Sequence, residues 1–110
     1  MNRVGPFLAV ISLLVAAGLE VAGDAVIRAG LRGRSGRVVA LGAVILAGYG
    51  VVVNLVPWDF SRLLGTYIAV FAVAAILVGR FHFGDLIPWS TWLGLALIVL
   101  GAAVIQLGSR

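Results

Sequence analysis

Three charged residues in the amino-terminal apolar stretch of this 110-residue chain have types and spacing that allow chemistry. Glu20, Asp24 and Arg28 follow one another at four-residue intervals, so on a helix they project from one side. A carboxylate within a membrane span costs roughly 2.5–3.5 kcal/mol on insertion scales, so it normally faces a cavity or a partner. Glu20 lies deepest in the stretch, and we expect it to carry the function.

A carboxyl group in a low-dielectric site can hold a proton or a cation, because burial favours its neutral form and a nearby positive charge favours its ionised form. This exclusivity is the chemical basis of proton-coupled antiport. The residues one turn from Glu20 are small and leave room for a ligand or a second helix, and we expect three of them to line a substrate cavity: Ala16, Ala17 and Gly23. The alternative is that Glu20 forms a structural ion pair with Arg28 or with a neighbouring chain.

Asp24 lies about 6 Å further along the same helix than Glu20. It is a weaker candidate for a second proton or substrate site, and the spacing favours a pair with Arg28 near the membrane surface. The Arg28 side chain is long enough to reach the lipid headgroups, so we do not expect it to bind substrate.

The composition excludes most other functions. The chain is 63% hydrophobic and only 11% charged, whereas soluble proteins average about 25% charged residues. It has no cysteine and a single histidine, His82, so it offers no thiolate or histidine zinc site. No nucleophile–base pair is visible, and we expect neither an enzyme nor a cofactor. The net charge of +4 comes from arginines between apolar runs, which is typical of membrane flanks and not of a nucleic-acid partner.

The elements that position Glu20 are four apolar segments, each near the roughly 20 residues that cross a bilayer as a helix. Because unpaired backbone groups are costly in lipid, we expect an all-α membrane protein. The connections are too short for a soluble domain, so residues 1–110 are predicted to form a single four-helix transmembrane domain. The predicted helices cover about 6–29, 38–56, 62–79 and 86–107, with the last one starting at Leu86 or at Trp89.

Flanking residues predict how the chain sits in the bilayer. Trp58, Trp89 and Trp92 fall where spans should meet the headgroups, as in an aromatic belt. Three arginines lie on one predicted side, at 3, 62 and 110, against four or five on the other, at 32, 34, 37, 80 and, near the boundary, 28. So small a bias leans towards both termini outside and also allows insertion in both orientations.

The last span carries glycines seven residues apart, with isoleucines between them on the same face. Small residues in such a seam let membrane helices approach closely. The seam serves either packing within one chain or a homodimer, and the need to surround Glu20 with protein favours the homodimer. Its predicted interface residues are Gly94, Ile98, Gly101 and Ile105.

Four further residues within the spans have predicted roles. Tyr67, in the third span, is predicted to place its ring and hydroxyl against a ligand near Glu20, with a core aromatic as the alternative. Tyr49 and Phe71 are expected to pack, and Asn54 to form a hydrogen bond at a helix end.

These residues resemble the small multidrug resistance family, the four-helix members of the drug/metabolite transporter superfamily, over nearly the whole chain. Leu19-Glu20-Val21-Ala22-Gly23 is similar to that family's A-E-[VI]-x-G membrane-glutamate motif, and a basic residue follows eight positions later at Arg28. Tyr67 stands where the family usually has a tryptophan, and Gly94 to Gly101 match its G-L-x-L-I-x-x-G run. The resemblance implies an antiparallel dimer, inserted in both orientations or built from oppositely oriented paralogues. In such a dimer two glutamates exchange protons for cationic hydrophobic substrates by alternating access.

The second connection and the third span depart from that pattern. The family's glycine-rich kink after its aromatic residue is replaced by Ile68-Ala69-Val70-Phe71, and the connection is longer. Pro57, Arg62 and Tyr67, at five-residue intervals, instead resemble the YnfA-like family of small bacterial inner-membrane proteins.

We therefore expect a dimeric exporter in the bacterial inner membrane that exchanges protons for small cationic or lipophilic compounds through Glu20. The first alternative is a non-transporting membrane subunit that packs against a larger complex. The second is a flippase for lipids or carrier lipids, which is a role that the resemblance to the superfamily also implies.

Overall fold

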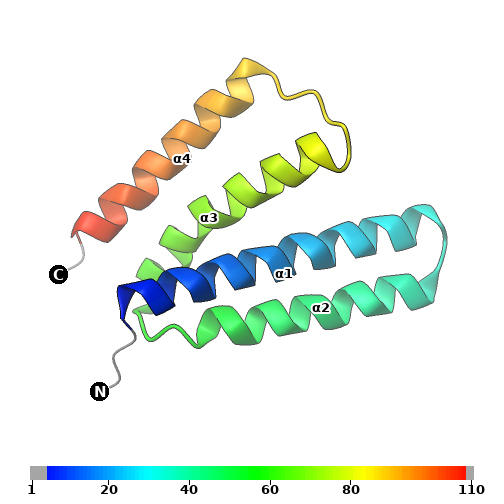
Figure 1. Ribbon diagram of the computed structural model, residues 1–110, viewed down its shortest axis with the longest axis horizontal. Helices are drawn as coiled ribbons and strands as arrows, with labels where there is room; N and C mark the ends of the chain where they lie inside the picture. Colours follow the sequence, from blue (N-terminus) through cyan, green and yellow to red (C-terminus); the bar gives the residue numbers. More distant parts are fainter. Residues whose placement is uncertain (1–4, 109–110) are drawn as a thin grey trace. The chain divides into compact units, whose positions relative to one another are not determined.

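The computed structural model describes residues 5–108, and all regular secondary structure within that range is α-helical (Figure 1). Each of four helices is long and apolar enough to cross a membrane. The predicted all-α membrane fold with four spans is therefore confirmed. The helices are α1 (Pro6–Arg32), α2 (Gly36–Asn54), α3 (Phe60–Phe81) and α4 (Trp89–Gly108).

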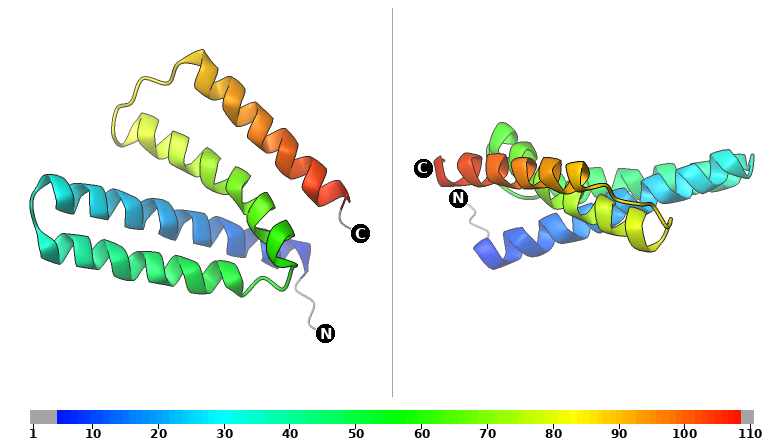
Figure 2. Two further views of the ribbon diagram at one scale, coloured as in Figure 1. Left: turned by 180° about the vertical axis from the view of Figure 1, so that it is seen from behind. Right: turned by 90° about the horizontal axis from the view of Figure 1, so that it is seen from above.

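The helices pair as two compact hairpins, divided after Pro57. In the first hairpin α2 returns along α1, and in the second α4 returns along α3, as both views in Figure 2 show. Antiparallel pairs with short turns bring residues at equal distances from the turn to the same depth. The first hairpin therefore decides what lies beside Glu20.

The turn of the first hairpin is shorter than predicted, because α1 continues three residues beyond 29 and α2 begins two residues before 38. Only Gly33–Ser35 separate the helices. Arginine side chains can carry their charges to the headgroups from a helical backbone, so the charged residues did not end α1 where the apolar run ends. Arg34 adopts the left-handed conformation, with φ 56°, and Ser35 caps α2 by accepting a hydrogen bond from the Val38 N–H.

Proline sets the boundaries of α2 and α4. The residue before a proline is disfavoured in the helical conformation, and the proline lacks an N–H. Accordingly α2 ends at Asn54 and not at 56, just before Pro57, and α4 begins at Trp89, after Pro88, so a start at Leu86 is wrong. Asn54 confirms its predicted role, because its Nδ2 donates to the Gly50 carbonyl at 2.7 Å.

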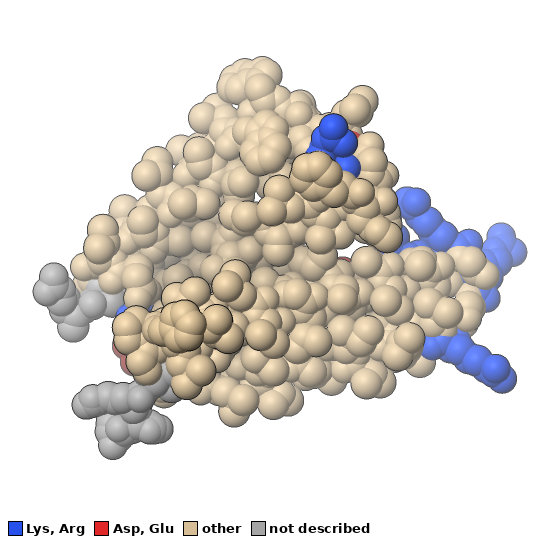
Figure 3. Space-filling view, viewed as in Figure 1, with Lys and Arg blue, Asp and Glu red and all other residues tan. Residues whose placement is uncertain are grey.

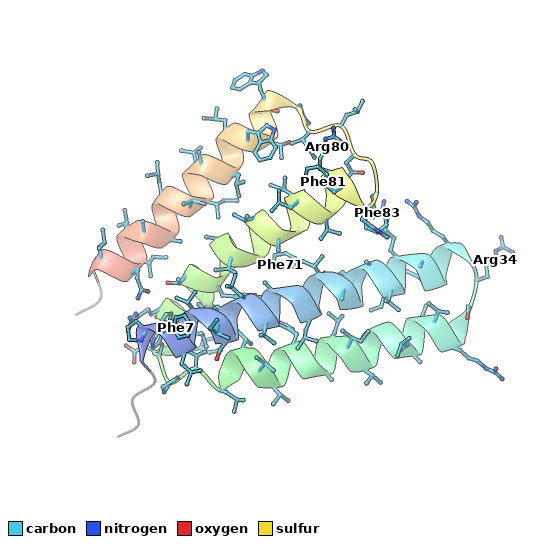
Figure 4. All side chains as sticks on the ribbon, viewed as in Figure 1. Phe7, Arg34, Phe71, Arg80, Phe81 and Phe83 are labelled. Atoms are coloured by element: carbon cyan, nitrogen blue, oxygen red, sulfur yellow. The ribbon has the colours of Figure 1, made fainter. Side chains whose placement is uncertain are left out.

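The third helix is longer at both ends than the predicted 62–79. It begins at Phe60, where the Asp59 carbonyl accepts from the Leu63 N–H at 2.8 Å, and it ends at Phe81. Arg80 lies in its last turn, where a cation complements the partial negative charge of the helix carboxyl end. Figure 4 shows Arg80, Phe81 and Phe83 around the turn to α4.

On the face drawn in Figure 3, arginine side chains gather at the turn of the first hairpin. Arg32, Arg34 and Arg37 are exposed there, and Arg34 projects from the tip (Figure 4). Arg3 and Arg110, which enter the orientation count, lie outside the described residues. The three tryptophans lie at helix ends as predicted: Trp58 precedes α3, and Trp89 and Trp92 lie in the first turn of α4.

Candidate functional site

Glu20 lies at the middle of α1, with fourteen helical residues before it and twelve after it. At 1.5 Å per residue it is therefore about 20 Å from either end, deeper than its place in the predicted helix. Its side chain is half-buried. A carboxylate at this depth normally faces the interior of a helix bundle or a water-filled cavity, where it pairs with protein groups, a ligand or a proton.

The small residues around Glu20 are buried, and α2 fills the space over one of them. Ala16 and Ala17 are 0% and 2% exposed. At Gly23 a methyl group would lie 2.7 Å from Leu46 Cδ2 and 3.1 Å from the Gly42 carbonyl oxygen. The small side of α1 at Gly23 is therefore in contact with the second helix, which was one of the two predicted alternatives, a helix or a ligand. The lining of a substrate cavity by Ala16, Ala17 and Gly23 stays a prediction.

Contacts at three glycines give the register of the first hairpin. Gly30 lies against Val39, then Gly42 against Ile27, then Gly23 against Leu46. From one contact to the next, the residue number on α1 falls by three and then four, and the number on α2 rises by the same amounts. This is expected for two antiparallel helices that pack along one stripe. The next step of three pairs Glu20 with Tyr49.

The same register continues beyond Glu20 and agrees with burial. A further step of four aligns Ala16 with Val53, and a step of three aligns Leu13 with Val56. All four side chains are buried. Glu20 thus belongs to a stripe that is apolar on both sides of it, with Tyr49 as its counterpart on α2.

The register brings Tyr49 of α2 to the depth of Glu20, and Tyr49 interacts electrostatically with both acidic residues of α1, Glu20 and Asp24. The phenol is half-buried. The sequence analysis predicted that Tyr49 packs, and it did not predict the alignment of Tyr49 with Glu20. The position of the turn could have predicted this alignment. The turn is centred between residues 34 and 35, and residues 20 and 49 lie equally far from that centre.

Asp24 and Arg28 point away from the helix contact. A helix turns about 100° per residue, so Asp24 lies about 40° from Glu20 on one side, whereas Gly23 lies about 60° from it on the other. Asp24 and Arg28 are exposed, in contrast to buried Gly23. Glu20 therefore lies between the apolar contact with α2 and a charged strip on α1. This arrangement gives the carboxyl group access to a ligand from the side of Asp24.

Tyr67 lies in the second hairpin and is 3% exposed. Its ring centroid is 6.3 Å from that of Phe71, one turn along α3, so the expected packing role of Phe71 is met by an aromatic pair. The prediction that Tyr67 lies near Glu20 involves residues of different hairpins, and it stays a prediction.

The second hairpin has a polar contact that the sequence analysis did not identify. Gln106 Oε1 of α4 accepts hydrogen bonds from Thr66 Oγ1 at 3.0 Å and from Arg62 Nε at 3.3 Å. The Arg62 guanidinium also lies 4.3 Å from the centroid of the Trp58 ring, a cation–π distance. These contacts connect the start of α3 to the end of α4 and hold Arg62 at the membrane boundary.

The predicted interface on α4 is divided between packing inside the hairpin and open surface. Ile105 lies over Gly65 of α3, where a methyl group would be 2.8 Å from Ile105 Cδ1. At Gly94 and Gly101 a methyl group would meet no atom within 4 Å in the described part of the chain, and Ile98 is 39% exposed. The residues Gly94, Ile98 and Gly101 thus form a surface that accepts close approach by another helix, and the homodimer stays a prediction.

Comparison with known proteins gives a relative that matches nearly the whole chain. The chain is 33% identical over 102 residues to a UPF0060 membrane protein of Herpetosiphon aurantiacus, a match that covers 90% of this chain and 93% of the relative. No family model and no solved structure matches the chain.

Proposed function

The chain belongs to the UPF0060 family of membrane proteins, and on that premise we propose that it is a proton-coupled antiporter that exports small cationic or lipophilic compounds. UPF0060 is the YnfA family, which the second connection and the third span were found to resemble. Membership of the small multidrug resistance family is part of the proposal. So is the location in a bacterial inner membrane, which the bacterial origin of the relative supports.

The observation that carries the proposal is the carboxyl group of Glu20 at the centre of α1. A charge at that depth is costly, so a sequence that retains it there gains something other than helix insertion. The group is half-buried and borders the exposed side of α1 through Asp24. It can therefore exchange partners without separation of α1 from α2.

Antiport follows from competition for one carboxyl group. When a proton occupies Glu20, the site is neutral and has little affinity for a cation. When a cationic substrate approaches, its charge stabilises the ionised carboxylate, and the proton leaves for solvent. If the protein changes access only when the site holds a proton or a substrate, the two fluxes are coupled in opposite directions.

The second part of the proposal is a homodimer, or a pair with an oppositely oriented paralogue, that contributes one Glu20 from each subunit. The open surface at Gly94, Ile98 and Gly101 supports it, because α4 exposes apolar surface that permits close helix contact. Tyr67 would line the substrate site, and Asp24 would serve as a weaker second acid.

Transport by reconstituted protein tests the proposal. Proteoliposomes with an imposed pH gradient should accumulate a hydrophobic cation such as tetraphenylphosphonium, and Glu20→Gln should abolish the gradient-driven flux. Glu20→Asp is the matched control, because it retains a carboxylate and should retain measurable flux. Unchanged proton-driven transport by Glu20→Gln would show that another group couples the fluxes.

A further inference from the structure

The packing of the first hairpin fixes the register that pairs Tyr49 with Glu20. At Gly30 a methyl group would lie 2.7 Å from the Val39 backbone nitrogen, and at Gly42 it would lie 2.8 Å from the Gly23 carbonyl oxygen. Both distances are to backbone, so α1 and α2 touch directly and cannot slide past each other by a residue without a clash. The pairing of Tyr49 with Glu20 is therefore a fixed property of the hairpin.

Tyr49 is the donor that α2 offers at the depth of Glu20. The ionisable residues of α2 are Arg37 and Tyr49, and Arg37 lies in the first turn, far from Glu20 along the hairpin. The other polar side chain near the middle or end of α2, Asn54, uses its Nδ2 to donate to the Gly50 carbonyl. A tyrosine hydroxyl donates one hydrogen bond, and an ionised carboxylate only accepts, so the two groups are complementary.

We propose that Tyr49 is a positioning residue whose hydroxyl donates to the Glu20 carboxylate and stabilises the ionised form that accepts a cationic substrate. The inference deepens the proposed function and rests on it for the role of the ionised carboxylate. It assigns to α2 a part in proton–cation exchange.

The other charged residues near Glu20 along the chain lie on α1. Asp24 is one turn away from it. Arg28 lies a further turn along α1, towards the membrane surface. In the proposed arrangement the Tyr49 hydroxyl donates from α2 to the Glu20 carboxylate without placing a cation in the substrate's position. A cation in that place would compete with the substrate, whereas a neutral phenol does not.

A titration of Glu20 in the absence of substrate tests the proposal. Glu20 is the only glutamate in the chain, so protein labelled with ¹³C at the glutamate side-chain carboxyl gives one resonance that needs no assignment. In lipid nanodiscs, Tyr49→Phe removes the hydroxyl and keeps the ring. Because loss of a hydrogen bond to a charged group weakens the ionised form by a factor of about ten or more, the midpoint should move upward by about one pH unit or more.

The single histidine provides an internal control. His82 lies at the end of α3, in the other hairpin, and its own titration should be the same in both proteins. A Glu20 midpoint unchanged within about 0.2 unit in Tyr49→Phe, with His82 also unchanged, would overturn the proposal, since one lost charge-assisted bond predicts several times that shift.

The reciprocal measurement uses the native tyrosine and does not depend on the stability of the Tyr49 variant. The ¹³Cζ resonance of Tyr49, identified by comparison with Tyr67→Phe, should shift with the same midpoint as the Glu20 carboxyl. In Glu20→Gln that step should vanish. A Tyr49 resonance that ignores the Glu20 titration would also overturn the proposal.

These results are separable from the proposed function. If the Glu20 midpoint is unchanged in Tyr49→Phe and Glu20→Gln abolishes transport, the role of Tyr49 is rejected and the antiporter stands. If the midpoint moves upward in Tyr49→Phe and Glu20→Gln transports fully, the hydrogen bond from Tyr49 stands and the antiporter is rejected.

Discussion

The contact between α1 and α2 at Gly42 predicts a large and local effect of adding one methyl group. In Gly42→Ala the new Cβ would lie 2.5 Å from Ile27 Cγ1, 2.8 Å from the Gly23 carbonyl oxygen and 2.9 Å from the Ile27 backbone nitrogen. The side chain of Ile27 can rotate, but the two backbone atoms belong to α1 itself. Relief of the clash therefore requires the helices to move apart.

The magnitude follows from those distances. Ordinary van der Waals contact between heavy atoms is near 3.5 Å, so the helices must separate by roughly half an ångström or more. Overpacking of this kind costs about 1–3 kcal/mol. Alanine also favours the helix over glycine by about 1 kcal/mol, which offsets part of the loss. The control Gly50→Ala isolates the clash, because it lies in the same helix and its Cβ would meet nothing within 4 Å.

Equilibrium unfolding in mixed micelles with a rising fraction of dodecyl sulfate, followed by near-ultraviolet circular dichroism, measures both variants. Gly42→Ala should be less stable than Gly50→Ala by about 1–3 kcal/mol, the cost of the clash alone. Equal stability would refute the tight α1–α2 contact. The register that pairs Glu20 with Tyr49 would then lose its basis.

Three further substitutions test the second hairpin and the secondary acid. Gln106→Leu removes the acceptor shared by Arg62 and Thr66, so the free energy of unfolding should fall by about 1–3 kcal/mol in the same titration, and an unchanged midpoint would contradict the polar contact. Gly65→Ala should cost less than half as much as Gly42→Ala, since the atom nearest to its Cβ would be Cδ1, the flexible end of the α4 isoleucine at 105; a larger loss would mean that backbone atoms obstruct it. Asp24→Asn should retain proton-driven flux within about tenfold of the native rate, equivalent to about 1.4 kcal/mol, and complete loss would make Asp24 a primary site.

The fold was predictable because lipid restricts the choice of structure. Four apolar runs of sufficient length allowed only helices, and the four helices are present. Helix ends were less predictable, because arginines near residue 30 can remain helical while their charges reach the headgroups. At Pro57 and Pro88, by contrast, the backbone chemistry of proline decides the ends, and the sequence contained that information.

The candidate site was partly predictable. The depth of Glu20 followed from counting along one apolar run, which needs no knowledge of other helices. The pairing of Tyr49 with Glu20 was not predicted, because it depends on the length of a turn that was predicted too long. The sequence could not predict that Ile105 packs against α3 while Gly94 and Gly101 stay open. A seven-residue repeat does not distinguish contact with α3 from contact with another chain.

Proton release measures the central claim most directly. Purified protein in weakly buffered nanodiscs at fixed pH should release protons when tetraphenylphosphonium is added, because the cation and the proton compete for Glu20. Glu20→Gln should release none, and Glu20→Asp should release protons with a displaced pH dependence. Equal release by the native protein and Glu20→Gln, or no release by the native protein at any pH, would contradict the exchange of protons for cations at this carboxyl group.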